Sequence, residues 1–369
     1  MITRRQFAAS APWLVGSPLA LSGCSQESTA DSYEAVAGRT WRLGALGSLE
    51  GAALGQELVR CATLAPSSHN TQCWKFALED NGRSIAILPD LARRCPAVDP
   101  DDHHLFVSLG CATENLIHAA LAHGLKGDAR FDPASDAVRV LLEPTRAQSS
   151  SLFMAIPHRQ STRGDYDGKP LSSEELALLE RAGSSDQVRM LLLTGRSAME
   201  KTLEYVVQGN IAQVADRAFV QELKAWIRFN GAAAVRTRDG LYSVATGNPN
   251  IPAWIGDLLF GWLFTAKGEN DKAAPQVRSS AGMAVFVGQA ADKTHWVEVG
   301  RCYERFALQA TALGIRNALL NQPIEVRALR PQFAAAIGLA DQRPDLVARF
   351  GRGPTMPSSL RRPIQAVMV

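Results

Sequence analysis

The chain has 369 residues, of which 46% are hydrophobic and 20% are charged, and its formal net charge is +3. This composition is ordinary for a globular protein with a substantial core, and the length suits two domains or one large one. The nearly balanced charge excludes a general nucleic-acid binder, which would need a basic face.

The first residues predict an export signal. "TRRQF" supplies two adjacent arginines, an apolar region follows from Ala8 to Leu21, and "LSGC" ends the segment at Cys24. A charged head, a short apolar region and a small-residue cleavage site are typical of a signal peptide and not of a membrane span. Loss of Arg4 and Arg5 with this signal would lower the net charge from +3 to +1.

The same residues resemble two bacterial export motifs. The head resembles a twin-arginine translocation signal, and "LSGC" resembles a lipobox, in which Cys24 becomes the lipid-modified first residue. This resemblance implies a signal over residues 1–23, a tether over 24–42, and a periplasmic or cell-surface protein held at the membrane by a lipid anchor. Because the twin-arginine route moves folded proteins, it also favours a bound cofactor. A chance cysteine after a signal peptide is the alternative.

The first half of the remaining chain predicts helices and strands in alternation. Apolar residues at helical spacing from Leu43 to Ala62 predict a helix that stops at Pro66. Two apolar runs around Asn81-Gly82 predict a β-hairpin. A long, apolar helix follows in "HLFVSLGCATENLIHAALAHGL", and short strands are expected near 129–131 and 138–142.

The second half repeats this alternation after a Ser-rich join at 148–151. Helices are expected over 174–182, 197–208 and about 219–229, and a strand over 188–194. An aromatic stretch broken by Gly and Pro, 241–264, precedes the strand "AGMAVFVGQ" and the long helix "HWVEVGRCYERFALQATALGI". The two long helices share a Gly, an apolar periodicity and a Gly-apolar end, which predicts a duplicated α+β unit with halves at 43–150 and 151–369.

Four short segments carry a resemblance to the FMN-dependent nitroreductase superfamily. "APSSHNTQCW" at Ala65–Trp74 resembles its flavin loop, with Cys73 in place of a usual Pro. "HRQSTRGDY" resembles its opening R-x-S-x-R phosphate motif, "SLRRPIQAVMV" its closing basic segment, and "LGIRNALLNQP" the segment that ends at the flavin ring.

The order of these motifs implies a fused architecture. In the superfamily, R-x-S-x-R precedes the flavin loop within one unit, and two units share each flavin. Here the loop lies in the first half and the arginine motif opens the second, without a second copy of either. The chain therefore resembles the two-halved Acg-type flavoproteins, which implies a nitroreductase-like α+β fold with two tandem related halves, an intramolecular pseudo-dimer and one FMN site.

The resemblance also implies the site residues. Arg gives a planar, bidentate fork for a phosphate, and Pro stiffens a loop so that less entropy is lost on binding. Backbone groups at Asn321 and Gln322 are expected to face the flavin N5. The full set of expected FMN-binding residues is Pro66, Ser67, Ser68, Asn70, Arg159, Gln160, Ser161, Arg163, Asn321, Gln322 and Arg361.

Each candidate also has a structural interpretation. Arg159 and Arg163 alone could be surface charges, Asn70 could cap a turn, and Arg361 could lie in a frayed tail. For His103 and His104 we expect a polar loop before a helix and not a metal site. The spacing of the cysteines does not suggest a metal site either. Buried free thiols are favoured over a disulfide. Cys73 could also place a thiol near the flavin ring.

Three functions follow from these residues. The first is a flavin-dependent oxidoreductase that passes two electrons to a small organic acceptor, with the electron donor, substrate and oligomeric state unknown. The alternative is a flavin-sequestering or storage protein whose FMN is shielded and barely turns over. Residues 241–270 are a possible lid over the flavin, or else an ordinary core helix. The third is a cell-surface binding lipoprotein that has lost its cofactor.

Overall fold

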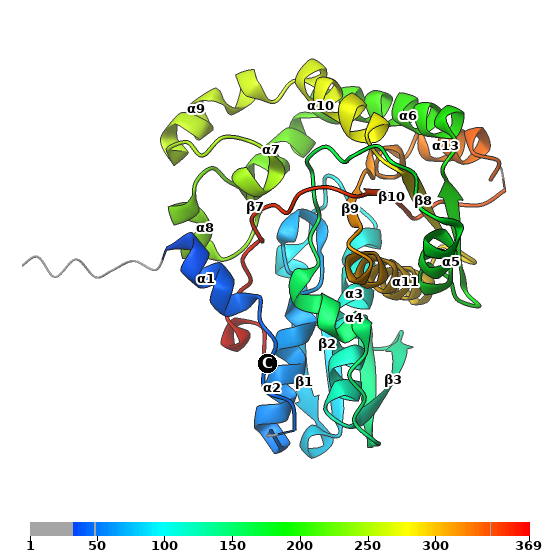
Figure 1. Cartoon of the computed structure of the whole chain (residues 1–369). Coiled ribbons are helices and arrows are strands. Elements are labelled where there is room, and N and C mark those ends of the chain that lie inside the picture. The colour runs from blue at the N-terminus through cyan, green and yellow to red at the C-terminus, as the bar shows by residue number, and fades with distance from the viewer. Residues whose placement is uncertain (1–31, 48, 340) are drawn as a thin grey trace, which may run out of the picture. The chain divides into compact units, whose positions relative to one another are not determined.

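Two four-stranded antiparallel sheets organise the protein, as the computed structural model shows for residues 32–47, 49–339 and 341–369 (Figure 1). The expected export signal and Cys24 lie outside these described residues. When the strands of each sheet are numbered along the chain, their order across the sheet is first, second, fourth and third. The first sheet contains β1 (Trp74–Glu79), β2 (Ser84–Pro89), β4 (Ala137–Pro144) and β3 (Leu125–Asp132).

The second sheet repeats this order with a long insertion. It contains β5 (Val188–Leu193), β8 (Gly282–Gly288), β10 (Leu346–Gly351) and β9 (Arg316–Leu319). A tight turn at the predicted Asn81-Gly82 joins β1 to β2, whereas a helical insertion separates the equivalent β5 and β8. The insertion comprises α6 (Arg196–Ala215), α7 (Arg217–Trp226), β6 (Ile227–Arg228), α8 (Gly231–Thr237), β7 (Leu241–Tyr242), α9 (Ala253–Leu263) and α10 (Ala266–Arg278).

The two long helices cross between the sheets at a pair of glycines. Helices α3 (His103–Ala122) and α11 (Lys293–Ala312) have 20 residues each, and Gly110 and Gly300 are the eighth residue of their helices. A Cβ on Gly110 would lie 1.9 Å from the Val297 carbonyl oxygen, and a Cβ on Gly300 would lie 1.9 Å from that of Val107. The reciprocal contact relates the two long helices by a pseudo-twofold axis, as a pair of tandem halves requires. The expected bounds of the halves, 43–150 and 151–369, stay a prediction.

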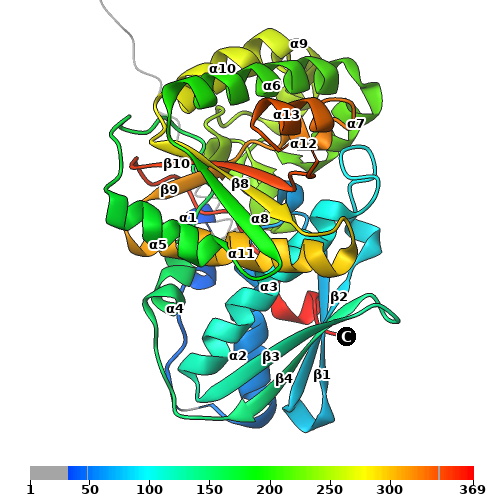
Figure 2. The same ribbon diagram turned by 90° about the vertical axis from the view of Figure 1, so that its right-hand side faces the viewer.

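The core lies on both faces of the second sheet. Along β8, Ala284 and Phe286 face the core that contains α3 and α11, while Met283 and Val285 face a second cluster with α6 and α10. This alternation is the period of two that a strand buried on both faces requires. Figure 2 shows α11 between the two sheets and α6 and α10 beyond the second sheet.

Two chain segments pair with strand edges, one by crossing from the second half to the first and the other within the second half. The C-terminal residues pair with β1, where Phe76 N donates to Val367 O and Val369 N donates to Phe76 O, at 2.8 and 3.0 Å. Ser161 bridges to Asn317 in β9, and Thr162 N donates to Asn317 O at 2.9 Å. These pairings fix the ends of the segments that contain the two arginine motifs.

The remaining helices surround this frame. They are α1 (Tyr33–Thr40), α2 (Gly51–Thr63), α4 (Ser151–Ala155), α5 (Ser173–Gly183), α12 (Gln322–Glu325) and α13 (Arg330–Ala336). Helix α2 begins at Gly51 and not at the predicted Leu43, because residues 41–47, 49 and 50 are not helical.

Three other expectations can be compared with the structure. His103 and His104 are the first two residues of α3 and are buried, so the predicted polar loop there is wrong. No group of three or more His, Cys, Asp or Glu in the described residues could hold a metal, and Cys61, Cys73, Cys95, Cys111 and Cys302 are free and buried. Helix α3 is long and apolar enough to span a membrane, but 83% of that window is buried in the core.

Candidate functional site

The loop after α2 has an unusual backbone. His69, Asn70 and Gln72 all have positive φ, at 48°, 52° and 54°. Residues other than glycine rarely adopt this left-handed conformation, and it persists only where the surroundings hold it. A cluster of such residues in one loop is typical of a functional site.

Side chains of the loop bind the chain on either side. Asn70 Nδ2 donates to Gly240 O at 3.0 Å and to Leu360 O at 3.2 Å, and its Oδ1 accepts from Arg361 Nη1 at 2.9 Å. Ser67 Oγ accepts from Gln72 N at 2.9 Å. The loop is therefore fixed between the insertion of the second half and the C-terminal segment.

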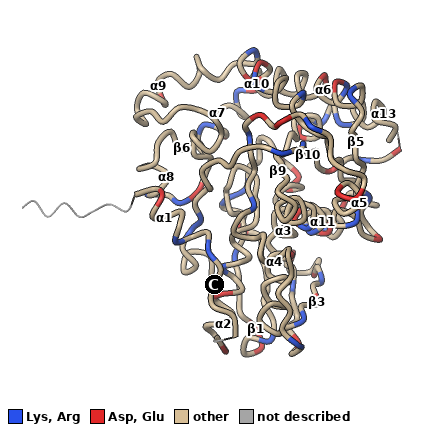
Figure 3. The backbone as a smooth tube through the Cα atoms, in the orientation of Figure 1, with Lys and Arg blue, Asp and Glu red and all other residues tan. Residues whose placement is uncertain are grey.

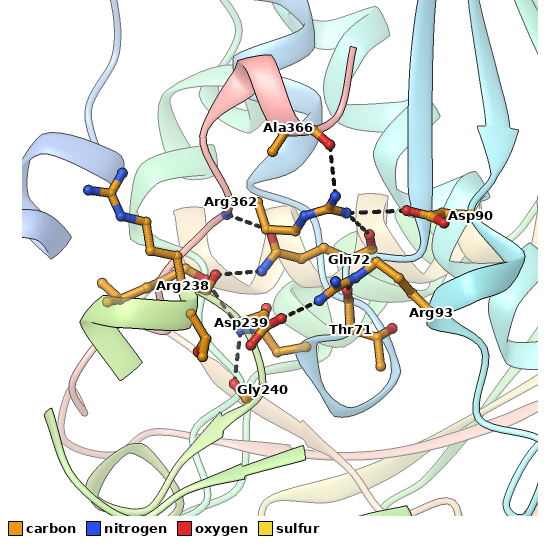
Figure 4. Close-up of polar contacts among 12 residues, drawn as sticks. Thr71, Gln72, Asp90, Arg93, Arg238, Asp239, Gly240, Arg362 and Ala366 are labelled. Atoms are coloured by element: carbon orange, nitrogen blue, oxygen red, sulfur yellow. Dashed lines mark hydrogen bonds and ion pairs between the residues drawn. The ribbon is translucent and has the colours of Figure 1, made fainter. Parts of the chain in front are cut away.

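Gln72 connects the same segments on the other side of the loop (Figure 4). Its Nε2 donates to Arg238 O at 2.8 Å, and its Oε1 accepts from Arg362 N at 2.7 Å. Arg93 donates to Thr71 O and forms an ion pair with Asp239. These contacts explain how a strained loop can keep one conformation.

Arg159 lies in a buried ion pair. Its Nε is 3.2 Å from Glu304 Oε1, and its Nη2 donates to Leu64 O at 2.9 Å. Glu304 is fully buried in α11, and Asn115, with its amide turned to suit both neighbours, donates to the same Oε1 at 2.9 Å. Burial raises the pKa of Glu304 to about 7, although Arg159 acts against this shift. Glu304 therefore neutralises the charge of Arg159 only in part.

Arg361 caps the end of α2. Its guanidinium donates to the carbonyl oxygens of Thr63, Leu64 and Ala65 at 2.7 to 3.0 Å. Helix ends leave such carbonyls without partners, and a cation there is favourable. Burial and then Arg159 lower the pKa of Arg361 to about 9. The tail at Arg361 is thus ordered, and this side chain holds the loop in place.

Arg163 is the exception among the three arginines. No hydrogen-bond or ion-pair partner faces its guanidinium in the part of the chain that the structure describes. Burial lowers its pKa, because a desolvated cation without a counter-charge is unfavourable. The hydroxyl of Ser161 likewise has no hydrogen-bond partner among the described residues. A charged donor and a hydroxyl, two residues apart, remain available to a ligand.

A narrow cavity joins these groups. Its volume is about 50 Å³, far below the roughly 300 Å³ or more of a typical small-molecule site. It can hold the end of a ligand, such as a phosphoryl group, but not a tricyclic ring. No acidic residue lines it among those described. The lining comprises Trp41, Pro66, Ser67, Asn70, Arg159, Gln160, Ser161, Arg163, Leu241, Ala245, Pro357, Ser358, Ser359 and Arg361.

The structure thus gathers most of the expected site residues. Eight line the cavity: Pro66, Ser67, Asn70, Arg159, Gln160, Ser161, Arg163 and Arg361.

The other three do not line this cavity. Ser68 belongs to the same loop. Asn321 follows β9, where its Oδ1 accepts from Val347 N at 2.9 Å. Gln322 begins α12, and its buried Oε1 has no hydrogen-bond partner among the residues that the structure describes. That Asn321 and Gln322 face a flavin stays a prediction.

Some site residues were missed in the sequence. The Trp41 ring lies 4.8 Å from Arg361 and 5.9 Å from Arg159, a cation–π geometry, and Trp41 belongs to an irregular segment without a motif. Glu304 carries a usable signal, because a lone carboxylate four residues after Gly300 falls on the apolar face of a predicted helix.

Two residues near the loop are poor acid–base candidates. Burial, then Arg163 and His104, lower the pKa of His69 to about 4, so His69 is neutral at pH 7. Burial raises the pKa of the Cys73 thiol to about 11, which keeps it protonated and unreactive. The placement of this thiol near a flavin ring stays a prediction.

Comparison with known proteins finds similarity over most of the chain. A Mycobacterium tuberculosis protein named "Putative NAD(P)H nitroreductase", known from two strains, is 25% identical over 320 residues, which cover 83% of this chain and 88% of that protein. No protein-family model matches the chain.

Solved structures of nitroreductases are more distant. The FMN-dependent nitroreductase NfnB of Mycobacterium smegmatis in complex with NADPH is 15% identical, with a TM-score of 0.38 over 59% of this chain and 91% of that one. A Desulfitobacterium hafniense nitroreductase with bound FMN is 13% identical, with a TM-score of 0.37 over 58% of this chain and 95% of that one. At these TM-scores the structural likeness supports no conclusion by itself.

Proposed function

We propose that this protein is an FMN-binding, nitroreductase-like oxidoreductase that passes two electrons to a small organic acceptor. The observation that carries the proposal is the cavity between the two halves, where Arg163 has a half-buried guanidinium without a partner among the described residues. A desolvated cation in a cavity without acidic lining favours an anionic ligand. The segments that resemble the FMN-dependent nitroreductase superfamily support FMN as that ligand, and the similarity to a protein named as an NAD(P)H nitroreductase agrees with a redox function.

The donor set suits a phosphate. Arg163, Ser161 and the uncommitted Nη1 group of Arg159 would hold it, because charge-assisted N–H donors bind phosphate oxygens strongly. Arg361 and Asn70 bind each other and the backbone, so they would position the loop. Pro66 and Ser67 would form the rim. The expected roles of Ser68, Asn321 and Gln322 toward the flavin ring belong to this proposal.

Bound flavin supplies the redox chemistry, as an acceptor and donor of two electrons. The residues of the chain would bind, orient and shield it. The cavity volume of about 50 Å³ means that binding of a whole flavin requires movement of the segments that cover the cavity. Leu241 and Ala245 lie in one such segment and Pro357 to Ser359 in another.

This covering favours a second candidate, a protein that sequesters FMN. Leu241 and Ala245 belong to the stretch 241–270 that the sequence suggested as a lid, and they contact the cavity directly. A covered flavin would be shielded from a nicotinamide donor. The two candidates share the same binding site and differ in access to it.

Export and lipid anchoring complete the proposal. The twin arginine and the "LSGC" segment support transport by the twin-arginine route and lipidation of Cys24. Mass spectrometry of Cys24 tests the anchor: a diacylglycerol adduct supports it, and an unmodified, uncleaved N-terminus contradicts it.

A visible spectrum separates the functions. We expect the purified protein to be yellow and to contain one FMN per chain. Rapid bleaching by NADPH supports the oxidoreductase, whereas bleaching by dithionite alone supports sequestration. A colourless protein that takes up no added FMN contradicts both and leaves the third possibility, a lipoprotein that has lost its cofactor.

A further inference from the structure

Helix α9 exposes a stripe of large apolar side chains. Trp254, Leu258 and Trp262 follow one another at intervals of four residues, so they share one face of the helix. They are 69%, 70% and 84% exposed. Leu259 and Leu263 widen the stripe at 39% and 60%. Elsewhere in the described residues (32–47, 49–339 and 341–369), exposed large apolar residues form no comparable run.

The opposite face of α9 anchors it to the protein. Phe260 is buried against Phe229 and Phe264, with ring centroids 6.3 and 5.3 Å away. Gly256 is also buried, and a Cβ there would lie 2.3 Å from the Phe229 ring. The helix is therefore held by its inner face, which leaves its outer face toward solvent.

The outer face also lacks charge. Asp257 is the sole ionisable residue of α9, and it pairs with Lys224 at 3.5 Å. Figure 3 shows α9 almost entirely in the colour of uncharged residues, whereas neighbouring α10 carries both signs. Contiguous apolar surface of this kind marks a binding face.

The chemistry of the stripe suits a lipid surface. Trp side chains favour the boundary between water and hydrocarbon, because they combine a large apolar ring with one polar N–H group. A helix of 11 residues is about 16 Å long, about half the thickness of the hydrocarbon core. Such a helix can lie in the plane of the interface but cannot span the bilayer.

The start of the described chain also favours a membrane as the occupant. Seven residues separate Cys24 from Ser32, so a lipid on Cys24 would keep Ser32 within about 27 Å of the bilayer. Ser32 caps α1, which packs on α8 through Tyr33, Val36 and Ala234. Figure 1 shows α1, α8 and α9 along the same side of the described unit.

We propose that the outer face of α9 lies in the surface of the bilayer that anchors the chain. This inference rests on the proposed anchoring at Cys24 for its geometry and on the stripe itself for its chemistry. The diacylglycerol expected on Cys24 would hold the chain at the membrane at one point, and contact of the stripe would add a second point of attachment. The bilayer contact would also fix which side of the protein faces the membrane.

Vesicle binding tests the contact apart from the anchor. The full chain with Cys24→Ser, which cannot be lipidated, would be mixed with vesicles of phosphatidylethanolamine and a minority of phosphatidylglycerol. Trp254→Ser with Trp262→Ser should lower the partition coefficient by roughly tenfold, since two large rings lose their lipid contact. The matched control, Leu141→Ser with Ile211→Ser, removes exposed apolar groups elsewhere and should leave it unchanged.

Brominated lipid gives a second readout. It should quench tryptophan fluorescence in the Cys24→Ser protein, and Trp254→Phe with Trp262→Phe should remove most of that quenching. Both proteins would carry Trp13→Phe, because Trp13 lies in the apolar region of the expected signal and could itself contact lipid. Equal partition of the Trp and control variants would overturn the proposal. Two other results with unchanged vesicle binding would also overturn it. If the Trp variant converts a dimer to a monomer, the stripe contacts a second copy of the chain. If the variant changes FMN retention, the stripe acts as a lid.

Discussion

Two equivalent glutamates on the crossing helices have opposite surroundings. Glu114 in α3 and Glu304 in α11 each follow the crossing glycine by four residues, and both are buried. Glu114 Oε2 accepts from Arg301 and Arg305, both at 3.0 Å. Although burial raises the pKa of Glu114, the charge of Arg305, a hydrogen bond from His118 and the charge of Arg301 hold it well below its usual value. Glu304, with Arg159 as its cation, has a raised pKa.

The difference comes from the residues that each helix presents to the other. Arg301 and Arg305 of α11 face Glu114, whereas the equivalent positions of α3 are Cys111 and Asn115, which carry no charge. Glu304 must therefore take its cation from Arg159 of the arginine motif. One side of the pseudo-twofold axis is a closed ion cluster, and the other opens on the cavity. The duplicated fold has kept its symmetry in the backbone and lost it in the site.

The largest expected effect concerns the part that the two halves share. Gly300→Ala places a Cβ 1.9 Å from the Val107 carbonyl, a backbone contact that cannot yield easily. We expect a loss of about 3 kcal/mol or more in unfolding free energy, measured by chemical denaturation. Gly110→Ala should cost as much, since its contact is reciprocal.

Gly261→Ala in α9 is the matched control, because nothing lies within 4 Å of the added Cβ. It should change stability little or raise it. An unchanged stability for Gly300→Ala or Gly110→Ala would contradict the crossing at these glycines.

The second prediction separates the open side from the closed one. Arg163→Ala removes the unpartnered cation and should weaken FMN binding about 10- to 100-fold, the loss expected for one or two charge-assisted hydrogen bonds. Arg305→Ala should leave FMN binding unchanged and lower stability by about 1–3 kcal/mol, because Glu114 keeps Arg301. Fluorescence titration of the apoprotein measures the first effect and thermal unfolding the second. An equal loss of FMN binding in both variants would contradict the distinction between the open and the closed side.

The third prediction uses the opposite pKa shifts. Glu304 binds protons more tightly in the folded state, so its stabilising contribution is present below its unfolded pKa of 4.5 and is lost as the pH rises through about 7. The wild type should lose about 2 kcal/mol relative to Glu304→Gln between pH 5.5 and 8.

Glu114 should behave in the opposite way. Its depressed pKa stabilises the fold above about 4.5 and is lost in acid. Glu114→Gln should therefore lower stability throughout pH 5.5 to 8 without changing the slope. Unfolding curves in urea at several pH values measure both, and parallel pH profiles for wild type and Glu304→Gln would refute the assignment.

The smallest expected effect concerns the two loops that precede the first strand of each sheet. Gln72→Leu removes hydrogen bonds to Arg238 and Arg362 and should lower stability by about 1–2 kcal/mol. Gln187→Leu in the equivalent turn before β5 should change it by less than about 0.5 kcal/mol, because that side chain is exposed. If thermal unfolding finds the two equal, the long loop is not held as described.

Local patterns in the sequence predicted the frame of the fold. The Asn81-Gly82 hairpin, the long helices and the duplication all follow from turn chemistry, periodicity and the repeated glycines. Contacts between distant residues were beyond such patterns. Capping of α2 by Arg361, nearly 300 positions away, depends on the C-terminal strand pairing that brings the tail back to β1.

The sequence indicated which residues would meet at the cavity, but not what each of them contacts there. Arg159, Arg163 and Arg361 were expected to act alike, yet Arg159 pairs with Glu304, Arg361 caps a helix, and Arg163 has no partner within the described part of the chain. That division depends on burial and on neighbours from four separate segments. Spacing alone contains no such information.

The flavin content of purified protein tests the single open site most directly. Absorbance near the flavin maximum, divided by protein concentration, should give one FMN per chain in the wild type and in Arg305→Ala, and a value near zero in Arg163→Ala after dialysis. Two FMN per chain, or full retention by Arg163→Ala, would contradict a single site built around the free arginine.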